Sequence, residues 1–207
     1  MEINEKEVLR YLGYRNHQAD DAVLKYIEET KTELQSFLAP QYVYGQWKCT
    51  VDPAGTVGIE SIIISSKNLA SHIMGCECAV LFAVTLGVAA DTAIRRYSIT
   101  DSARAAVAQA VCAAMLEGLC DEIERHVSDE AAADGLHCRP RFSPGFGDFS
   151  LCHQKDILAL LERKKRIGIT LTDSFMMIPT KSVTALIGQM GCSKTNSISS
   201  QPQRGVS

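Results

Sequence analysis

Hydrophobic positions in the first forty residues recur at helical spacing. They predict one helix over residues 4–12 and a longer one over residues 20–38, with a break between them. Asn4 can cap the first helix, and Asp20 or Asp21 can cap the second. Val23, Ile27 and Leu34 form the apolar stripe of the second helix. Because Pro40 stops the second helix, we expect a helical N-terminal segment over residues 1–40.

The pattern changes to short β runs after residue 40. Residues 41–51, rich in aromatic and β-branched side chains, predict a strand, and a second strand is expected over residues 57–64. Residues 66–75 suit a short helix that ends at a glycine. The apolar run 78–87 is short for a helix and predicts the central strand of a sheet, covered on both faces.

The longest helical pattern begins at a capping sequence, Ser98-Ile-Thr-Asp101. It predicts a helix over residues 101–127, preceded by a short helix over residues 91–96. Residues 128–150 contain Gly and Pro and show no periodicity, so they are expected to form a long connection. Long connections in compact domains are uncommon and often carry function.

The C-terminal part mixes the two kinds of element. A helix is predicted over residues 155–166, followed by strands at 169–171 and within 182–188. Together with the preceding elements this predicts an α+β core over residues 41–190. Residues 191–207 are polar and Ser-rich with few large apolar side chains, which is typical of a disordered tail.

Charge and hydropathy exclude two classes of partner. The formal charge of -3, the pI near 6.0 and the interspersed acids and bases provide no basic surface for nucleic acid or an anionic membrane. No uninterrupted apolar run reaches the roughly 18 residues of a membrane span, and the polar start MEINEKEVLR is unlike a secretion signal. We therefore expect a cytoplasmic protein.

Known catalytic and metal-binding motifs are missing from the sequence. The eight cysteines contain no C-x-x-C pair, and although Cys76 and Cys78 would share one face of a strand, cytosolic cysteines usually serve as small buried hydrophobes. The five histidines show no ligand spacing. There is no G-x-S-x-G, H-E-x-x-H, P-loop or G-x-G-x-x-G before a helix.

The segment Arg141-Phe-Ser-Pro-Gly-Phe-Gly-Asp148 offers the first candidate chemistry. Pro144-Gly145 indicates a turn, and glycines let backbone amides approach a ligand closely. The guanidinium of Arg141 is suited to gripping a carboxylate with two parallel hydrogen bonds, so the segment fits an amino-acid ligand. The alternative is an ordinary Pro-Gly turn beside a solvated arginine.

Glu117 is the second candidate. Helical geometry places it within about 20° of Ala106 and Ala110, on a face of small side chains that another element can approach closely. A carboxylate there needs a partner, either an arginine or a cationic ligand such as a sulfonium amino acid. Alternatively, Glu117 begins the solvated end of the helix, because Asp121 and Glu124 continue its line.

These features resemble the activation domain of cobalamin-dependent methionine synthase, in its free-standing form. The resemblance is carried by RFSPGFGD, by the IPTKSV strand entry some thirty-five residues later, and by the Ala-rich helix with Glu117. It implies a twisted, mostly antiparallel sheet with a long central helix and flanking helices. It also implies a ligand, S-adenosylmethionine (AdoMet), held by an Arg-x-x-Pro-Gly-Tyr loop and a glutamate of the preceding helix, with a corrin ring facing the loop.

Transferred to this sequence, the resemblance assigns a role to five residues. Arg141 would bind the ligand carboxylate, Glu117 its amino group or sulfonium, and the backbone at Ser143 and Gly145 would complete the grip. Phe146 stands where the family usually has Tyr, which keeps an aromatic wall but removes a hydroxyl. A late aromatic contact of the family to adenine falls near Ile187, where stacking would be poor.

The implied function is help in the reductive remethylation of cob(II)alamin. The expected partners are a cobalamin-binding methionine synthase module and, as reductant, a flavodoxin-type protein; AdoMet and cobalamin are the expected cofactors. Two alternatives stay open. The chain is a docking or capping subunit that has lost AdoMet binding, or it is an independent methyltransferase, which the lack of a glycine-rich nucleotide loop disfavours.

Overall fold

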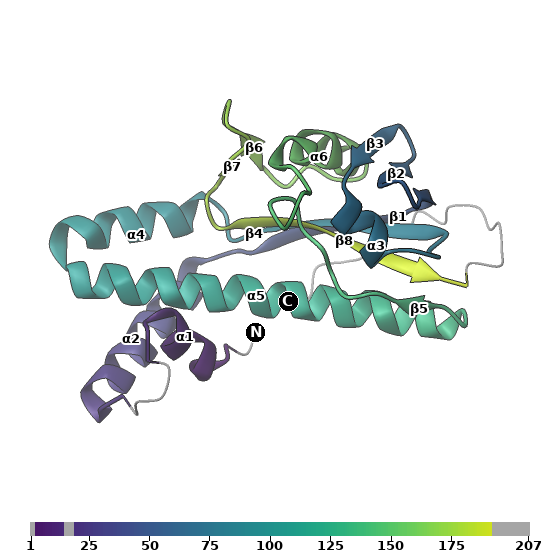
Figure 1. The fold of residues 1–207 in the computed structure, drawn as a ribbon. Coiled ribbons are helices and arrows are strands. Elements are labelled where there is room, and N and C mark those ends of the chain that lie inside the picture. The colour runs from purple at the N-terminus through teal and green to yellow at the C-terminus, as the bar shows by residue number, and fades with distance from the viewer. Residues whose placement is uncertain (1–2, 15–18, 192–207) are drawn as a thin grey trace.

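A six-stranded antiparallel sheet, in the order β3-β2-β1-β4-β8-β5, organises the protein (Figure 1). The computed structural model describes residues 3–14 and 19–191, so most of the predicted tail, residues 192–207, lies outside the described residues. The sheet strands are β1 (Gln41–Asp52), β2 (Thr56–Ile59), β3 (Ile62–Ser65), β4 (Cys78–Thr85), β5 (His137–Cys138) and β8 (Ser182–Met190). A separate pair consists of β6 (Thr170–Leu171) and β7 (Met177–Ile178).

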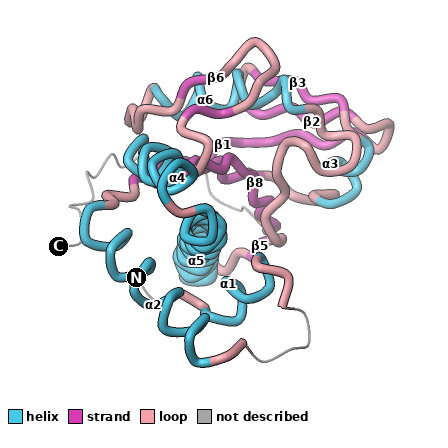
Figure 2. Tube along the Cα trace, turned by 90° about the vertical axis from the view of Figure 1, so that its left-hand side faces the viewer, coloured by secondary structure: helices cyan, strands magenta, loops and turns pink. Residues whose placement is uncertain are grey.

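The helices lie on both faces of this sheet. They are α1 (Glu5–Tyr11), α2 (Asp21–Phe37), α3 (Lys67–His72), α4 (Val88–Thr100), α5 (Ser102–Ala133) and α6 (Gln154–Glu162), with a 3-10 turn η1 (Leu151–His153) before α6. Figure 2 looks along α5 and shows it beneath the sheet, with α1 and α2 below it and α6 above the sheet. The fold is therefore α+β with a long central helix and flanking helices, as predicted.

Strand β4 explains why two cores form. All eight of its residues are buried, and it pairs with β1 on one side and β8 on the other, which confirms the predicted central strand. Successive side chains point to opposite faces. Val80, Phe82 and Val84 pack in the core that contains α5, whereas Ala79, Leu81 and Ala83 pack in the core that contains α6.

The N-terminal helices share the core of α5. Val8 of α1 and Ile27 and Leu34 of α2 are buried there, and both helices contact α5. Their predicted caps are confirmed, because the Asn4 side chain accepts a hydrogen bond from the amide of residue 6 and the Asp20 side chain accepts one from the amide of Val23.

Helix α5 begins at Asp101, the last residue of the predicted capping sequence, whose side chain accepts a hydrogen bond from the Arg104 amide. Ser98, the first residue of that sequence, lies in α4 instead. Among the described residues it is the one helix that is long and apolar enough to cross a membrane, judged by length and composition alone. However, 56% of its most apolar stretch is buried inside the fold, which is how the core helix of a soluble protein behaves.

Four predicted elements were wrong in extent, one of them the helix predicted over residues 155–166, which spans Gln154–Glu162. Residues 57–64 form a hairpin of β2 and β3 instead of one strand, because the chain turns at Glu60, whose φ is 52°. The short helix at 91–96 extends over the whole of α4. Residues 128–133, predicted as connection, continue α5, where buried Ala131 still packs against the core side of the helix.

Candidate functional site

The guanidinium of Arg141 lies against three carboxylates of α5. Arg141 Nη2 is 2.8 Å from Glu117 Oε2, and Nη1 is 2.6 Å from Asp121 Oδ1 and 2.5 Å from Glu124 Oε2. The carboxylates are spaced four and three residues apart, so they follow one face of the helix. The predicted pair, Arg141 and Glu117, is thus brought together from positions 24 residues apart in the chain.

Arg141 is fixed by its backbone as well as by its side chain. Its amide donates a 3.0 Å hydrogen bond to Glu124 Oε1, so Glu124 holds both ends of the residue. Burial by itself lowers the pKa of Arg141, but the hydrogen bonds to Asp121 and Glu124 outweigh that effect and raise the pKa above its ordinary value. The guanidinium is therefore a permanent cation at this position.

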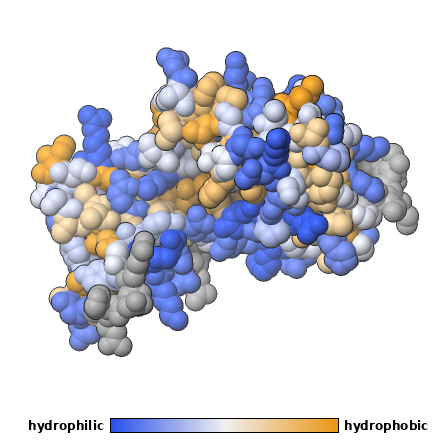
Figure 3. All heavy atoms as spheres, in the orientation of Figure 1, coloured by the Kyte–Doolittle hydropathy of each residue, from blue (hydrophilic) through white to orange (hydrophobic). Residues whose placement is uncertain are grey.

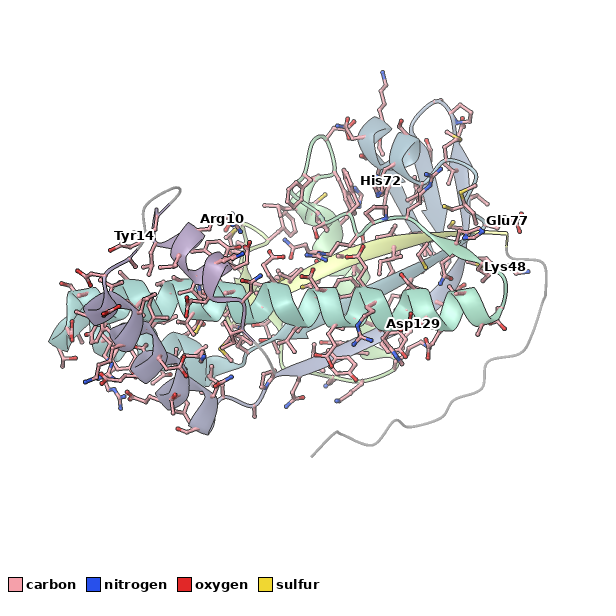
Figure 4. The ribbon with its side chains drawn as sticks, turned by 90° about the horizontal axis from the view of Figure 1, so that it is seen from below. Arg10, Tyr14, Lys48, His72, Glu77 and Asp129 are labelled. Atoms are coloured by element: carbon pink, nitrogen blue, oxygen red, sulfur yellow. The ribbon has the colours of Figure 1, made fainter. Side chains whose placement is uncertain are left out.

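A groove of about 830 Å³ opens beside this cluster, between α1 and α5. Its α5 wall consists of Ala114, Glu117, Gly118 and Asp121, and its other wall of Ile3, Asn4, Glu5, Glu7 and Arg10. The small residues at 114 and 118 let α1 approach α5 closely. Arg10, whose guanidinium pairs with Glu7 at 2.6 Å, is seen on α1 close to α5 in the view from below (Figure 4).

The segment that follows Arg141 forms a turn that is held by its own backbone hydrogen bonds. Pro144 is buried, and Gly145, with a φ of 98°, donates its amide to the carbonyl of Phe149 at 2.7 Å. The Ser143 carbonyl accepts the amide of Phe146 at 3.2 Å. The backbone groups of Ser143 and Gly145 just described are therefore engaged within the turn itself, and a ligand contact through the Gly145 amide would replace its bond to Phe149.

Two anchors hold the turn to the layer above the sheet. The carboxylate of Asp148 accepts hydrogen bonds from the Ser66 hydroxyl and from the amides of Lys67 and Asn68 at the start of α3. The hydrogen bond from the Ser66 hydroxyl, followed by those from the amides of Asn68 and Lys67, lowers the pKa of Asp148 below its ordinary value. The second anchor is Phe149, which is fully buried in the α6-side core.

An aromatic group lines the outer side of the turn. Phe142 lies 6.3 Å from Phe146 and 6.2 Å from Phe149 between ring centroids, and His72 of α3 is 5.0 Å from Phe142. The His72 ring nitrogen is also 2.7 Å from the Pro140 carbonyl, and Figure 4 shows the side chain at α3. Phe146 is 65% exposed, so it offers a flat apolar surface to a ligand or partner.

The face shown in Figure 3 mixes polar and apolar groups, with apolar surface along the seam between α5 and the layer above it. In the same orientation Figure 1 shows the chain between β5 and α6 crossing this face, and residues 139–150 belong to that connection. The site segment therefore bridges the layer of α5 and the layer of α6.

The structure brings together Arg141 and Glu117 but not every position that the sequence singled out. Ile187, near which the resemblance places a contact to adenine, has its side chain fully buried in the α5-side core. Asp121 and Glu124 entered the sequence analysis only through the alternative of a solvated helix end, although their spacing from Glu117 was the available signal for a shared partner. The groove against α1 had no signal in the sequence.

The comparisons with known proteins agree with this architecture. A family model described as "Vitamin B12 dependent methionine synthase, activation domain" matches residues 63–200, which is well over half of the chain. The chain belongs to this family. Among solved structures, the crystal structure of the MetH reactivation domain bound to AdoHcy is similar, with a TM-score of 0.64 and 15% identity, covering 95% of this chain and 72% of that one. Comparison with the curated proteins gave no match.

The fold likeness reaches further along this activation-domain chain than the family model does. The family model starts at Ile63 and so omits α1, α2, β1 and β2, while the similarity in structure covers 95% of the chain. At 15% identity this likeness concerns the fold, and the roles of individual side chains rest on their own geometry.

Proposed function

We propose that this chain binds AdoMet and serves as an accessory protein in the reductive remethylation of cob(II)alamin on a cobalamin-binding methionine synthase module. The observation that carries the proposal is the meeting of Arg141 and Glu117 at 2.8 Å, beside a turn that displays Phe146. Family membership as an activation domain supports the same role.

The charges at the site fit the amino-acid end of AdoMet. A guanidinium binds a carboxylate through two parallel charge-assisted hydrogen bonds, and a carboxylate binds an ammonium or sulfonium group. Arg141 and Glu117 supply one of each at adjacent positions, and both are partly exposed, with 25% and 43% of their side-chain surfaces accessible. In the bound state the carboxylate of the ligand would lie beside Arg141, and its amino group or sulfonium beside Glu117.

Positioning is the contribution of the protein. The turn at Ser143 and Gly145 and the ring of Phe146 would border the ligand, while the bound AdoMet supplies the methyl group and the corrinoid of the partner module supplies the metal chemistry. We further propose a flavodoxin-type reductant and a cytoplasmic location. Nucleic acid and membranes are not partners in this proposal, because the net charge is -3 and basic residues are interspersed with acids.

Equilibrium dialysis with labelled AdoMet tests the proposal, with and without a corrinoid module. Arg141→Ala should abolish retention of AdoMet without unfolding the chain, as checked by circular dichroism. Arg95→Ala, which removes the same charge from an exposed position on α4, is the matched control and should bind normally. Undiminished binding by Arg141→Ala would refute the role given to this residue.

A second candidate function is a docking or capping subunit that does not bind AdoMet. One observation favours it: both terminal nitrogens of Arg141 already bind carboxylates of α5. This candidate predicts a stable complex with the corrinoid module in which neither the wild type nor Arg141→Ala retains AdoMet. The same dialysis therefore separates the two functions.

A further inference from the structure

The three carboxylates around Arg141 are not equivalent. Glu124 is 23% exposed and makes two hydrogen bonds, one with Arg141 Nη1 and one with the Arg141 amide. Asp121 is 67% exposed and makes a single 2.6 Å contact with Nη1. Glu124 is thus a structural support of Arg141, whereas Asp121 is held at one point and lies mostly in water.

Asp121 occupies one of the hydrogen-bonding positions of the Arg141 guanidinium that a ligand carboxylate can use. A planar guanidinium binds a carboxylate side by side through two nitrogens, and here Nη1 is bonded by Asp121 and Glu124 while Nη2 is bonded by Glu117. A further carboxylate would bring four anions around one cation, and like charges at this distance repel. One of the present carboxylates must therefore leave when an acidic ligand arrives.

We propose that Asp121 is an internal competitor for Arg141: it neutralises the guanidinium in the free protein and withdraws when the carboxylate of AdoMet binds. This inference rests on the proposed function and adds to it a residue that sets ligand affinity. Asp121 is the member that leaves because it keeps most of its hydration while bound, so that its release costs little desolvation. It also lines the groove between α1 and α5, which provides space for the released side chain.

The competition makes a prediction opposite to that of a ligand contact. Asp121→Ala should lower the dissociation constant for AdoMet by about two- to fivefold, the range of an exposed ion pair. Asp121→Glu keeps a carboxylate within reach of Arg141 and should bind more like the wild type. Glu122→Ala, the neighbouring exposed acid on α5, removes the same charge and is the matched control, expected to leave affinity unchanged.

Isothermal calorimetry with AdoMet on the full chain, with thermal unfolding of each variant, decides the inference. Tighter binding by Asp121→Ala than by Glu122→Ala supports it. Equal or weaker binding overturns it, and a weaker value would mean that Asp121 contacts the ligand instead. If neither the wild type nor any variant binds AdoMet, the proposed function itself is refuted, and the inference with it. If the wild type binds AdoMet but Asp121→Ala binds no more tightly than Glu122→Ala, only the inference is refuted.

Discussion

Replacing Phe149 with alanine should lower the free energy of unfolding of the protein, because this side chain anchors residues 139–150 in the α6-side core. The side chain is 1% exposed, packs in the α6-side core and lies 6.2 Å from the ring of Phe142. Moving a buried Phe side chain back into water costs about 1.5–3 kcal/mol, and the cavity left behind brings typical Phe→Ala losses to about 3–5 kcal/mol. Because Phe142 and His153 border the ring and can move into part of the space, we expect about 3–4 kcal/mol.

Urea unfolding followed by circular dichroism measures this loss. The midpoint of Phe149→Ala should fall while the slope of the transition stays unchanged, and the melting temperature should drop by roughly 6–16 °C for a chain of this size. Phe149→Leu, which refills most of the volume, should lose less than half as much. A loss below about 1 kcal/mol for the alanine variant would refute the argument that Phe149 anchors the segment.

Two further predictions concern how the turn is attached to α3. Asp148→Asn should destabilise the protein at neutral pH. Because folding lowers the pKa of Asp148, the carboxylate stabilises the wild type at pH values above the unfolded-state pKa, and this contribution is lost as the pH falls through the folded-state pKa. The difference in melting temperature between wild type and variant should therefore shrink in acid, and a difference that stays constant with pH would contradict the prediction. Gly147→Ala should lower the free energy of unfolding in urea by more than Gly135→Ala does. Both glycines have a positive φ, but only at position 147 would an added Cβ meet a side chain, with Asn68 Nδ2 at 2.5 Å. Equal losses of free energy in the two variants would exclude this contact as the cause.

Local patterns predicted most of the fold because the information lies in short stretches. The uninterrupted apolar run of β4 indicated a strand covered on two faces, and Asp101 marked the start of α5. The errors arose where one backbone conformation decided the outcome. The positive φ of Glu60 splits a continuous β pattern into β2 and β3, and glutamate carries no sequence signal for that turn.

The candidate site was only partly predictable because it depends on contacts between distant segments. The turn chemistry of Pro144-Gly145 was visible in the sequence, and so was a lone carboxylate on a face of small residues. What no local pattern reports is that β5 and the residues after it return along α5, so that Arg141 meets three of its carboxylates. The side chain of Ile187 faces the α5-side core, a direction that strand alternation left open until the sheet was assembled.

The position of the site segment implies that its geometry depends on both layers. Arg141 is held by α5 on one side of the sheet, whereas Asp148 and Phe149 are held by α3 and the α6-side core on the other. The six residues between Arg141 and Asp148 include Phe146, whose distance from Arg141 is therefore fixed by how the layers pack. A substitution in either layer can thus alter the spacing between the charged part and the aromatic part of the site without touching a ligand, which is why each binding experiment above is paired with an unfolding measurement.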